Sequence, residues 1–215
     1  MPITARISLL KSIFGVAFVA VLLPMMPCDA ANNPSALDAK IKKGSFTDSR
    51  DGKSYKTVKL GNQTWMAENL DYNANGSKCY KNQESNCQKY GRLYNWGTAK
   101  SACPSGWHLP SKDEWQALVN LAEISGDGAG NVLKSFSDWN DGGNGDDAVG
   151  FSALPGGYGS SGGSFNNVGY GGYWWGSSES NAFNAYYRFM VYYNEDAYKD
   201  YEVKSYLFSV RCVQE

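Results

Sequence analysis

The chain has 215 residues, with 20 lysines and arginines against 21 aspartates and glutamates, and its formal net charge is −1. This balance excludes the strongly basic surface of a nucleic-acid-binding protein. Hydrophobic residues make up 42% of the chain and aromatic residues 14%, which is enough to pack the core of one globular domain or of two small ones.

The first 30 residues are typical of a secretory signal peptide. Arg6 and Lys11 precede an apolar run over residues 13–26, and polar sequence follows a cut after Ala30. The apolar run is shorter than the roughly 20 residues that cross a bilayer. We therefore expect an exported protein, secreted or at the cell surface, with no membrane span in the mature chain. A lipid anchor on Cys28 is the alternative.

Residues 31–45 are polar and lack a clear apolar period, so they predict a flexible leader. One domain is expected over residues 46–215. Near its start, apolar and polar side chains alternate over Tyr55–Leu60, a turn follows at Gly61-Asn62, and a second short run continues to Met66. This pattern predicts a β-hairpin.

A first helix is predicted in the segment that follows the hairpin. Leu93, Trp96, Ala99 and Cys103 recur at helical spacing, and Pro104 stops the segment. The helix is therefore expected to end just before the proline.

A second helix is predicted to begin after Ser111. Ser111 and Glu114 have the spacing of a capping box, in which each side chain accepts a hydrogen bond from the other residue's backbone N–H. Four apolar residues then recur on one helical face: Trp115, Leu118, Val119 and Ala122. Gly126 is well placed to end this helix.

From Ser125 onward the chain is rich in glycine, asparagine and aspartate, which predicts long loops interrupted by short strands. Two aromatic-rich runs near the C-terminus predict a closing antiparallel sheet. Phe208, Val210 and Cys212 would share one face of its last strand.

Four cysteines remain once the first 30 residues are removed: Cys79, Cys87, Cys103 and Cys212. An even number in an exported chain favours disulfides. Of the three pairings that four cysteines allow, we favour Cys79 with Cys87 and Cys103 with Cys212. A zinc site is disfavoured because the chain has no Cys-x-x-Cys pair and only one histidine.

Aromatic residues among glycines are the leading candidates for ligand binding. They are Tyr158, Tyr170, Tyr173, Trp174 and Trp175. Glycine lets a loop approach a ligand closely, and tyrosine and tryptophan combine an apolar face with a polar edge. We therefore expect a non-catalytic recognition module that binds a polysaccharide or a cell-surface protein.

No catalytic residue is assigned. His108 is the only histidine, and no serine or cysteine nucleophile motif accompanies it, so a structural or surface role is favoured. The alternative function is an exported, hydrolase-like enzyme on a lectin-like scaffold that uses His108 or loop carboxylates.

An acidic loop offers weak candidate ligands for calcium, and no cofactor is otherwise expected. The candidates are Asp138, Asn140, Asp141, Asp146 and Asp147. Calcium prefers oxygen ligands on a flexible loop, but Val149 stands where an EF-hand would require its terminal glutamate. A solvated loop is therefore favoured over a metal site.

Five segments occur in an order that resembles the Fibrobacter succinogenes major paralogous domain family. They are DGKSYKTVKLGNQTWMAENLDY, YGRLYNWGTAKSACPSGWHLPSKDEWQAL, GFSALPGGY, YWWGSSES and SVRCV. The resemblance covers residues 46–215 and implies an exported or surface-associated bacterial protein. The family has no established biochemical role, so the resemblance implies no activity.

HLPSKDEW and SVRCV are also distantly similar to segments of the formylglycine-generating, sulfatase-modifying family. This similarity implies an α+β, C-type-lectin-like fold with two helices, small and mostly antiparallel sheets and long glycine-rich loops. It does not imply that family's activity, because the chain has no counterpart of the reactive cysteine pair.

Overall fold

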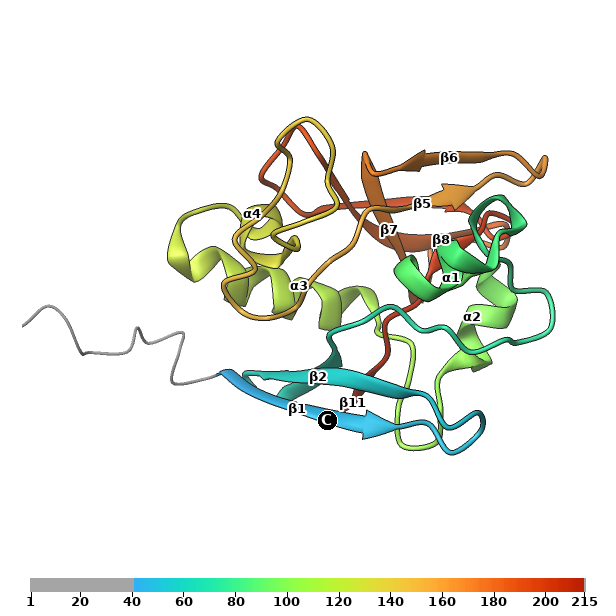
Figure 1. The fold of residues 1–215 in the computed structure, drawn as a ribbon, viewed down its shortest axis with the longest axis horizontal. Coiled ribbons are helices and arrows are strands. Elements are labelled where there is room, and N and C mark those ends of the chain that lie inside the picture. The colour runs from blue at the N-terminus through green and yellow to red at the C-terminus, as the bar shows by residue number, and fades with distance from the viewer. Residues whose placement is uncertain (1–40, 215) are drawn as a thin grey trace, which may run out of the picture. The chain divides into compact units, whose positions relative to one another are not determined.

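The structure, a computed structural model, describes residues 41–214. The predicted signal peptide, Cys28 and the first part of the predicted leader lie outside the described residues. The described part is α+β, with a four-stranded and a seven-stranded sheet. The helix α3 (Lys112–Ala122) lies between these two sheets (Figure 1).

The four-stranded sheet has the order β1-β2-β3-β11. Its strands are β1 (Ile41–Thr47), β2 (Ser54–Leu60), β3 (Gln63–Met66) and β11 (Val213–Gln214). The predicted hairpin is confirmed as β2 and β3, and Gly61 between them has a φ of 62°, which favours glycine.

Strand β1 begins inside the segment predicted as a flexible leader, so the ordered domain starts by Ile41 rather than at residue 46. Seven residues of β1 pair with β2, from Ile41 opposite Leu60 to Thr47 opposite Ser54. The strand was missed because its exposed edge carries polar residues, and only Ile41 and Phe46 are apolar. Backbone pairing along the whole strand and the packing of Ile41 and Phe46 against the cores hold it in the sheet.

The seven-stranded sheet is mixed and is centred on β7 (Gly171–Glu179), which runs parallel to β5 and β10 and antiparallel to β8. The other strands are β4 (Leu93–Tyr94), β5 (Gly156–Gly159), β6 (Phe165–Val168), β8 (Asn184–Val191), β9 (Tyr198–Val203) and β10 (Phe208–Ser209). In the described part of the chain, β9 pairs only with β8, so it forms an edge.

The predicted first helix is shorter than expected. Leu93 pairs with Ser209 in β4, and α2 begins only at Trp96, after Asn95 accepts a hydrogen bond from the backbone N–H of Thr98. The helical spacing of Leu93 is therefore accidental, because an asparagine cap separates it from the helix. The remaining helical elements are α1 (Glu84–Tyr90), α2 (Trp96–Ala102), α4 (Ala129–Leu133) and the 3-10 turns Tyr80–Asn82 and Glu123–Ser125.

The capping box at the start of α3 is confirmed. The Ser111 Oγ accepts from the Glu114 N–H at 3.2 Å, and Glu114 Oε2 accepts from the Ser111 N–H at 2.7 Å. All four predicted apolar residues of the helix are buried. Gly126 follows the 3-10 turn after α3 with a φ of 84°, as a helix-ending glycine should.

Both predicted disulfides are present: Cys79–Cys87 and Cys103–Cys212. The segment 208–214 belongs first to the seven-stranded sheet, through β10, and then to the four-stranded sheet, through β11. Phe208, Val210 and Cys212 enter one apolar core, as predicted. The Cys103–Cys212 bond therefore fastens the segment that joins the two sheets.

Candidate functional site

The adjacent tryptophans Trp174 and Trp175 are both completely buried, so neither ring is available to a ligand. They lie on opposite sides of β7 because side chains alternate along a strand. Trp174 packs toward α3, with its ring 6.3 Å from that of Trp115, and Trp175 lies 4.4 Å from Phe208 in the second core. The prediction that they bind a ligand is therefore wrong, since helices cover both sides of this strand.

Trp174 is instead part of a buried polar hub centred on Asn69. The Asn69 side-chain oxygen accepts from Trp174 Nε1 at 2.8 Å and from Arg211 Nε at 2.9 Å. The Asn69 side-chain nitrogen donates to the backbone oxygen of Tyr90 at 2.7 Å. Asn69, Trp174 and Arg211 come from three of the segments on which the family resemblance rests, so those segments meet here.

Arg211 in this hub is fully buried, and its guanidinium also donates to the backbone oxygens of Phe151 and Ser152. Burial lowers the pKa of Arg211. No carboxylate pairs with it among residues 41–214, so carbonyl and amide oxygens supply its stabilisation. The hub is structural, because Trp174 and Arg211 are completely buried and Asn69 is only 5% exposed.

Tyr158 and Tyr173, by contrast, belong to a partly exposed line of five rings on the seven-stranded sheet, which we call the aromatic row. In order along the row, its members are Tyr206, Tyr158, Tyr173, Phe189 and Tyr198. The successive ring centroids are 5.9, 5.0, 6.0 and 5.2 Å apart. The rings therefore contact one another and form a continuous surface.

Strand register explains why these rings share one face. Tyr173 on β7 lies opposite Phe189 on β8, and Phe189 lies opposite Tyr198 on β9. Tyr187 is two residues before Phe189, so it points to the same face, where its ring lies 4.7 Å from that of Phe208. In the sequence, the alternation in AYYRFMV indicates that Tyr187 and Phe189 share a face of one strand. It does not show which residues of the neighbouring strands lie opposite them.

The hydroxyl groups of Tyr173 and Tyr198 in the row make hydrogen bonds. Tyr173 accepts from the side-chain nitrogen of Asn167 at 2.9 Å. Burial raises the pKa of Tyr173, and also that of the neighbouring Tyr187. Both hydroxyls therefore stay protonated at neutral pH and can donate to a ligand.

Tyr170 does not belong to the aromatic row. Its ring is 42% exposed and packs edge-on against Tyr192 at 5.2 Å. Of the five predicted ligand-binding residues, the structure thus brings together Tyr158 and Tyr173, buries the two tryptophans and leaves Tyr170 apart. Phe189, Tyr198 and Tyr206 complete the surface and were not predicted.

His108 is arranged as part of the scaffold. Its backbone pairs with Val213, and its ring Nε2 lies 2.6 Å from Glu114 Oε1, while the other oxygen of that carboxylate caps α3. Burial raises the pKa of Glu114, but the hydrogen bonds from Ser111 and His108 outweigh it and hold that pKa below its ordinary value. Within residues 41–214, the His108 ring hydrogen-bonds only to Glu114, so this pair joins the start of α3 to the segment before it.

The acidic loop does not gather its side chains around one point. Asp138 pairs with Lys89 at 2.6 Å, Asp146 accepts from Asn131, and Asp147 accepts from Ser152. The backbone N–H of Asn140 donates to Gly169, and Asp141 is exposed. Among the described residues, no three carboxylates of this loop lie close enough to share a metal ion. The loop is therefore held by separate local bonds.

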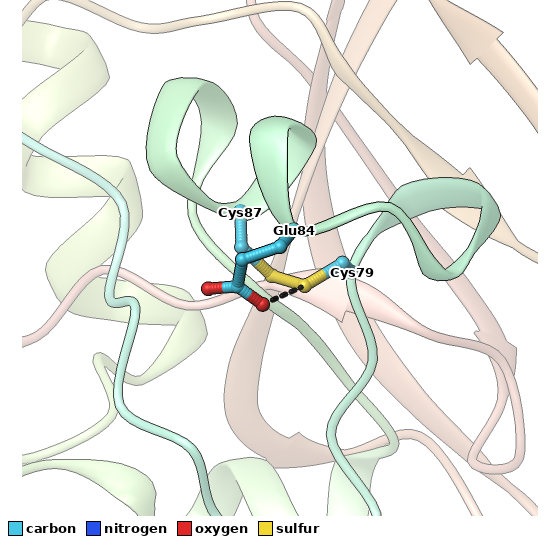
Figure 2. A group of neighbouring side chains, drawn as sticks. All are labelled: Cys79, Glu84 and Cys87. Carbon is cyan, nitrogen blue, oxygen red and sulfur yellow. Dashed lines mark hydrogen bonds between the residues drawn. A yellow bond between two sulfur atoms is a disulfide. The ribbon is translucent and has the colours of Figure 1, made fainter.

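One group within residues 41–214 has the composition of a metal site: Cys79, Glu84 and Cys87 (Figure 2). Both sulfur atoms are committed to a disulfide, and Glu84 Oε2 lies 3.4 Å from Cys79 Sγ. A metal binds the thiolate form of cysteine, so this disulfide removes the two ligands that would matter most. We assign no metal to the group.

A family model described as the Fibrobacter succinogenes major domain matches residues 58–214. The chain belongs to this family. The Fibrobacter succinogenes major domain thus runs from within β2 to β11, and it contains both disulfides, the Asn69 hub and the aromatic row, while β1 precedes it.

No curated protein and no solved structure matches the chain. None of the helices described in residues 41–214 is long and apolar enough to cross a membrane.

Proposed function

We propose that this Fibrobacter succinogenes major domain is an exported, non-catalytic recognition module that binds polysaccharide along its aromatic row. The observation that carries the proposal is the contact of five partly exposed rings across strands β7, β8 and β9 and the neighbouring segments. We further propose that the arrangement of sheets and helices is C-type-lectin-like.

The chemistry of the row suits a sugar chain. A pyranose ring has apolar C–H faces and a rim of hydroxyls, and tyrosine offers an apolar ring together with a hydroxyl. A line of touching rings fits an extended chain better than a compact ligand. Because the rings pack against each other and stand on paired strands, they lose little side-chain entropy when a ligand binds.

Two disulfides support export. Disulfides persist in oxidising surroundings such as the outside of a bacterial cell, where polysaccharides are found. The Cys103–Cys212 bond also fastens β11 and β10, and thus stiffens the sheet that carries the row.

A retention assay tests this function. The purified protein is incubated with a panel of insoluble polysaccharides, and both retained protein and released sugar are measured. Wild type and Tyr201→Ala are expected to be retained equally, and Phe189→Ala much less. Tyr201 is a matched control because it is a 53% exposed tyrosine on the opposite face of the β8–β9 hairpin.

Three results would contradict the proposal. Equal retention of folded Phe189→Ala and wild type would mean that the row is not the binding surface. Release of sugar by the wild-type protein would replace a recognition module by an enzyme. Retention by cell-surface protein but by no polysaccharide would also count against the proposal.

A further inference from the structure

The two faces of the β8–β9 hairpin carry opposite charges. On the face of the aromatic row, Asp200 lies directly opposite Tyr187, and Glu202 lies opposite Ala185. Tyr198, Asp200 and Glu202 are two residues apart along β9, so all three point to this face. Carboxylates therefore line the outer edge of the row.

These two carboxylates are not neutralised by a neighbouring cation. No ion pair within the described chain involves Asp200 or Glu202. Burial is the main cause that raises the pKa of Tyr187, and the charges of Asp200 and Glu202 add to it. The strand register places Asp200 beside Tyr187 and Glu202 beside Ala185, next to the rings of the row. Near the end of the row, Asp196 accepts from the hydroxyl of Tyr198 at 3.1 Å.

Cations near the row are engaged elsewhere. The Lys204 ammonium, just beyond β9, lies 3.2 Å from Glu179 and above the Trp96 ring at 4.5 Å. Lys199 belongs to the opposite face, because it lies opposite Arg188, which is buried on the α3 side of the sheet. On the β9 side, the ring surface is thus bordered by the carboxylates of Asp200 and Glu202, while Lys204 pairs with Glu179.

The opposite face carries two exposed lysines, Lys112 and Lys199. Lys112 and Lys199 lie 5.7 and 6.0 Å from the ring centre of Tyr186, and Arg188 is buried close by. The guanidinium of Arg188 donates to Ala197 and Gln116, and no carboxylate pairs with it in the part of the chain described here. An acidic polymer would therefore be attracted to this face rather than to the aromatic row.

We propose that the aromatic row selects neutral polysaccharides, and that Asp200 and Glu202 are the residues that determine this specificity. The inference rests on the proposed function and names its substrate class. A carboxylate accepts hydrogen bonds from sugar hydroxyls, and such charge-assisted bonds are stronger than neutral ones. The same carboxylates repel uronate and sulfate groups of acidic polysaccharides.

Pairs of neutral and charged polymers separate hydrogen bonding to sugar hydroxyls from repulsion of acidic groups. Affinity electrophoresis is run in gels that contain hydroxyethylcellulose or carboxymethylcellulose, and dextran or dextran sulfate, so that each pair shares a backbone and differs in charge. Wild type is expected to be retarded by at least one neutral member and tenfold less by its charged partner. Added salt should reduce this difference, because it screens repulsion.

The double variant Asp200→Asn with Glu202→Gln keeps the shape and removes the charge. We expect it to bind the charged polymer at least threefold better than wild type and the neutral polymer less well. The variant Lys112→Ala with Lys199→Ala is the control, since it removes binding of acidic polymers to the opposite face. It should leave retardation by the neutral polymer unchanged.

Three results would overturn the inference. The first is that a neutral polymer and its charged partner retard wild type equally, and that they also retard the Lys112→Ala, Lys199→Ala variant equally. The second is a neutralised variant that keeps the wild-type preference. In both cases the proposed function would stand. Lack of retardation by every polysaccharide would overturn the proposed function, and this inference with it.

Discussion

The indole nitrogen of Trp174 donates a hydrogen bond of 2.8 Å to the side-chain oxygen of Asn69, which is 105 residues away in the sequence. The same oxygen accepts from Arg211, so one amide joins β7 and the C-terminal segment to the loop after β3. All three side chains are buried, and the Asn69 oxygen is the acceptor for both the Trp174 indole and the Arg211 Nε.

Asn69→Ala is therefore expected to lower the free energy of unfolding by about 3 kcal/mol or more, because it leaves buried donors of Trp174 and Arg211 without an acceptor. Urea denaturation measures this change. Asn73→Ala, at an exposed asparagine in the following loop, should change stability by less than about 0.5 kcal/mol. If Asn69→Ala lowers the free energy of unfolding by less than about 1 kcal/mol, the hub does not contribute strongly to stability.

Substitution of either adjacent tryptophan should damage the fold. Trp174→Ala and Trp175→Ala each leave a large cavity in a different core, and such changes cost about 3–5 kcal/mol. Phe183→Ala is the control, because Phe183 is 77% exposed. Thermal unfolding followed by circular dichroism compares the three variants. A tryptophan variant as stable as wild type would contradict the burial described above.

The two disulfides are expected to contribute unequally. Chain-entropy reasoning gives about 4–5 kcal/mol for Cys103–Cys212, which spans 109 residues, and about 2.5 kcal/mol for Cys79–Cys87, which spans 8. Urea denaturation of the Cys103→Ala, Cys212→Ala and the Cys79→Ala, Cys87→Ala double variants tests the order. A greater loss in the second variant would reverse it.

Asp48 provides a prediction about pH. Its pKa is lowered, first by the side-chain hydrogen bonds from Arg50, one of which is 2.6 Å long. A carboxyl whose pKa is lower in the folded state stabilises the fold above its unfolded pKa of about 3.9, and this stabilisation is lost as the pH falls through the folded pKa. Asp48→Asn should therefore cost about 1–2 kcal/mol at pH 7, and this cost should shrink as the pH falls below about 3.9.

Denaturation of Asp48→Asn and wild type at several pH values measures this difference. Asp141→Asn is the control, because Asp141 is exposed and makes no ion pair in the described chain. A stability difference between Asp48→Asn and wild type that does not shrink between pH 5 and pH 2 would contradict the account.

Local chemistry was readable from the sequence, and pairing between distant segments was not. The Gly61 turn, the Ser111 capping box and the disulfides each depend on residue type and spacing within an element, or on a cysteine count. The sequence around Trp174 and Trp175 resembles a binding patch. Nothing in the adjacent sequence shows that α3 covers one side of β7 and α2 the other.

The aromatic row was only partly predictable for the same reason. Tyr158, Tyr173 and Phe189 lie on three different strands, and they meet through the registers of β5, β7 and β8. A shift of one residue in any pairing would turn a ring to the other face of the sheet. Composition could therefore indicate aromatic binding, while the choice of rings required the three-dimensional structure.

The most direct test of the account is a calorimetric titration of one soluble neutral polysaccharide into wild type, Tyr173→Ala and Tyr201→Ala. Removal of a central ring should raise Kd at least tenfold, which corresponds to about 1.4 kcal/mol, and Tyr201→Ala should change Kd less than twofold. If Tyr173→Ala does not fold, Tyr198→Ala on the edge strand β9 replaces it. Two results would contradict binding along the aromatic row. They are wild-type affinity in a folded variant that lacks a ring of the row, and loss of affinity in Tyr201→Ala alone.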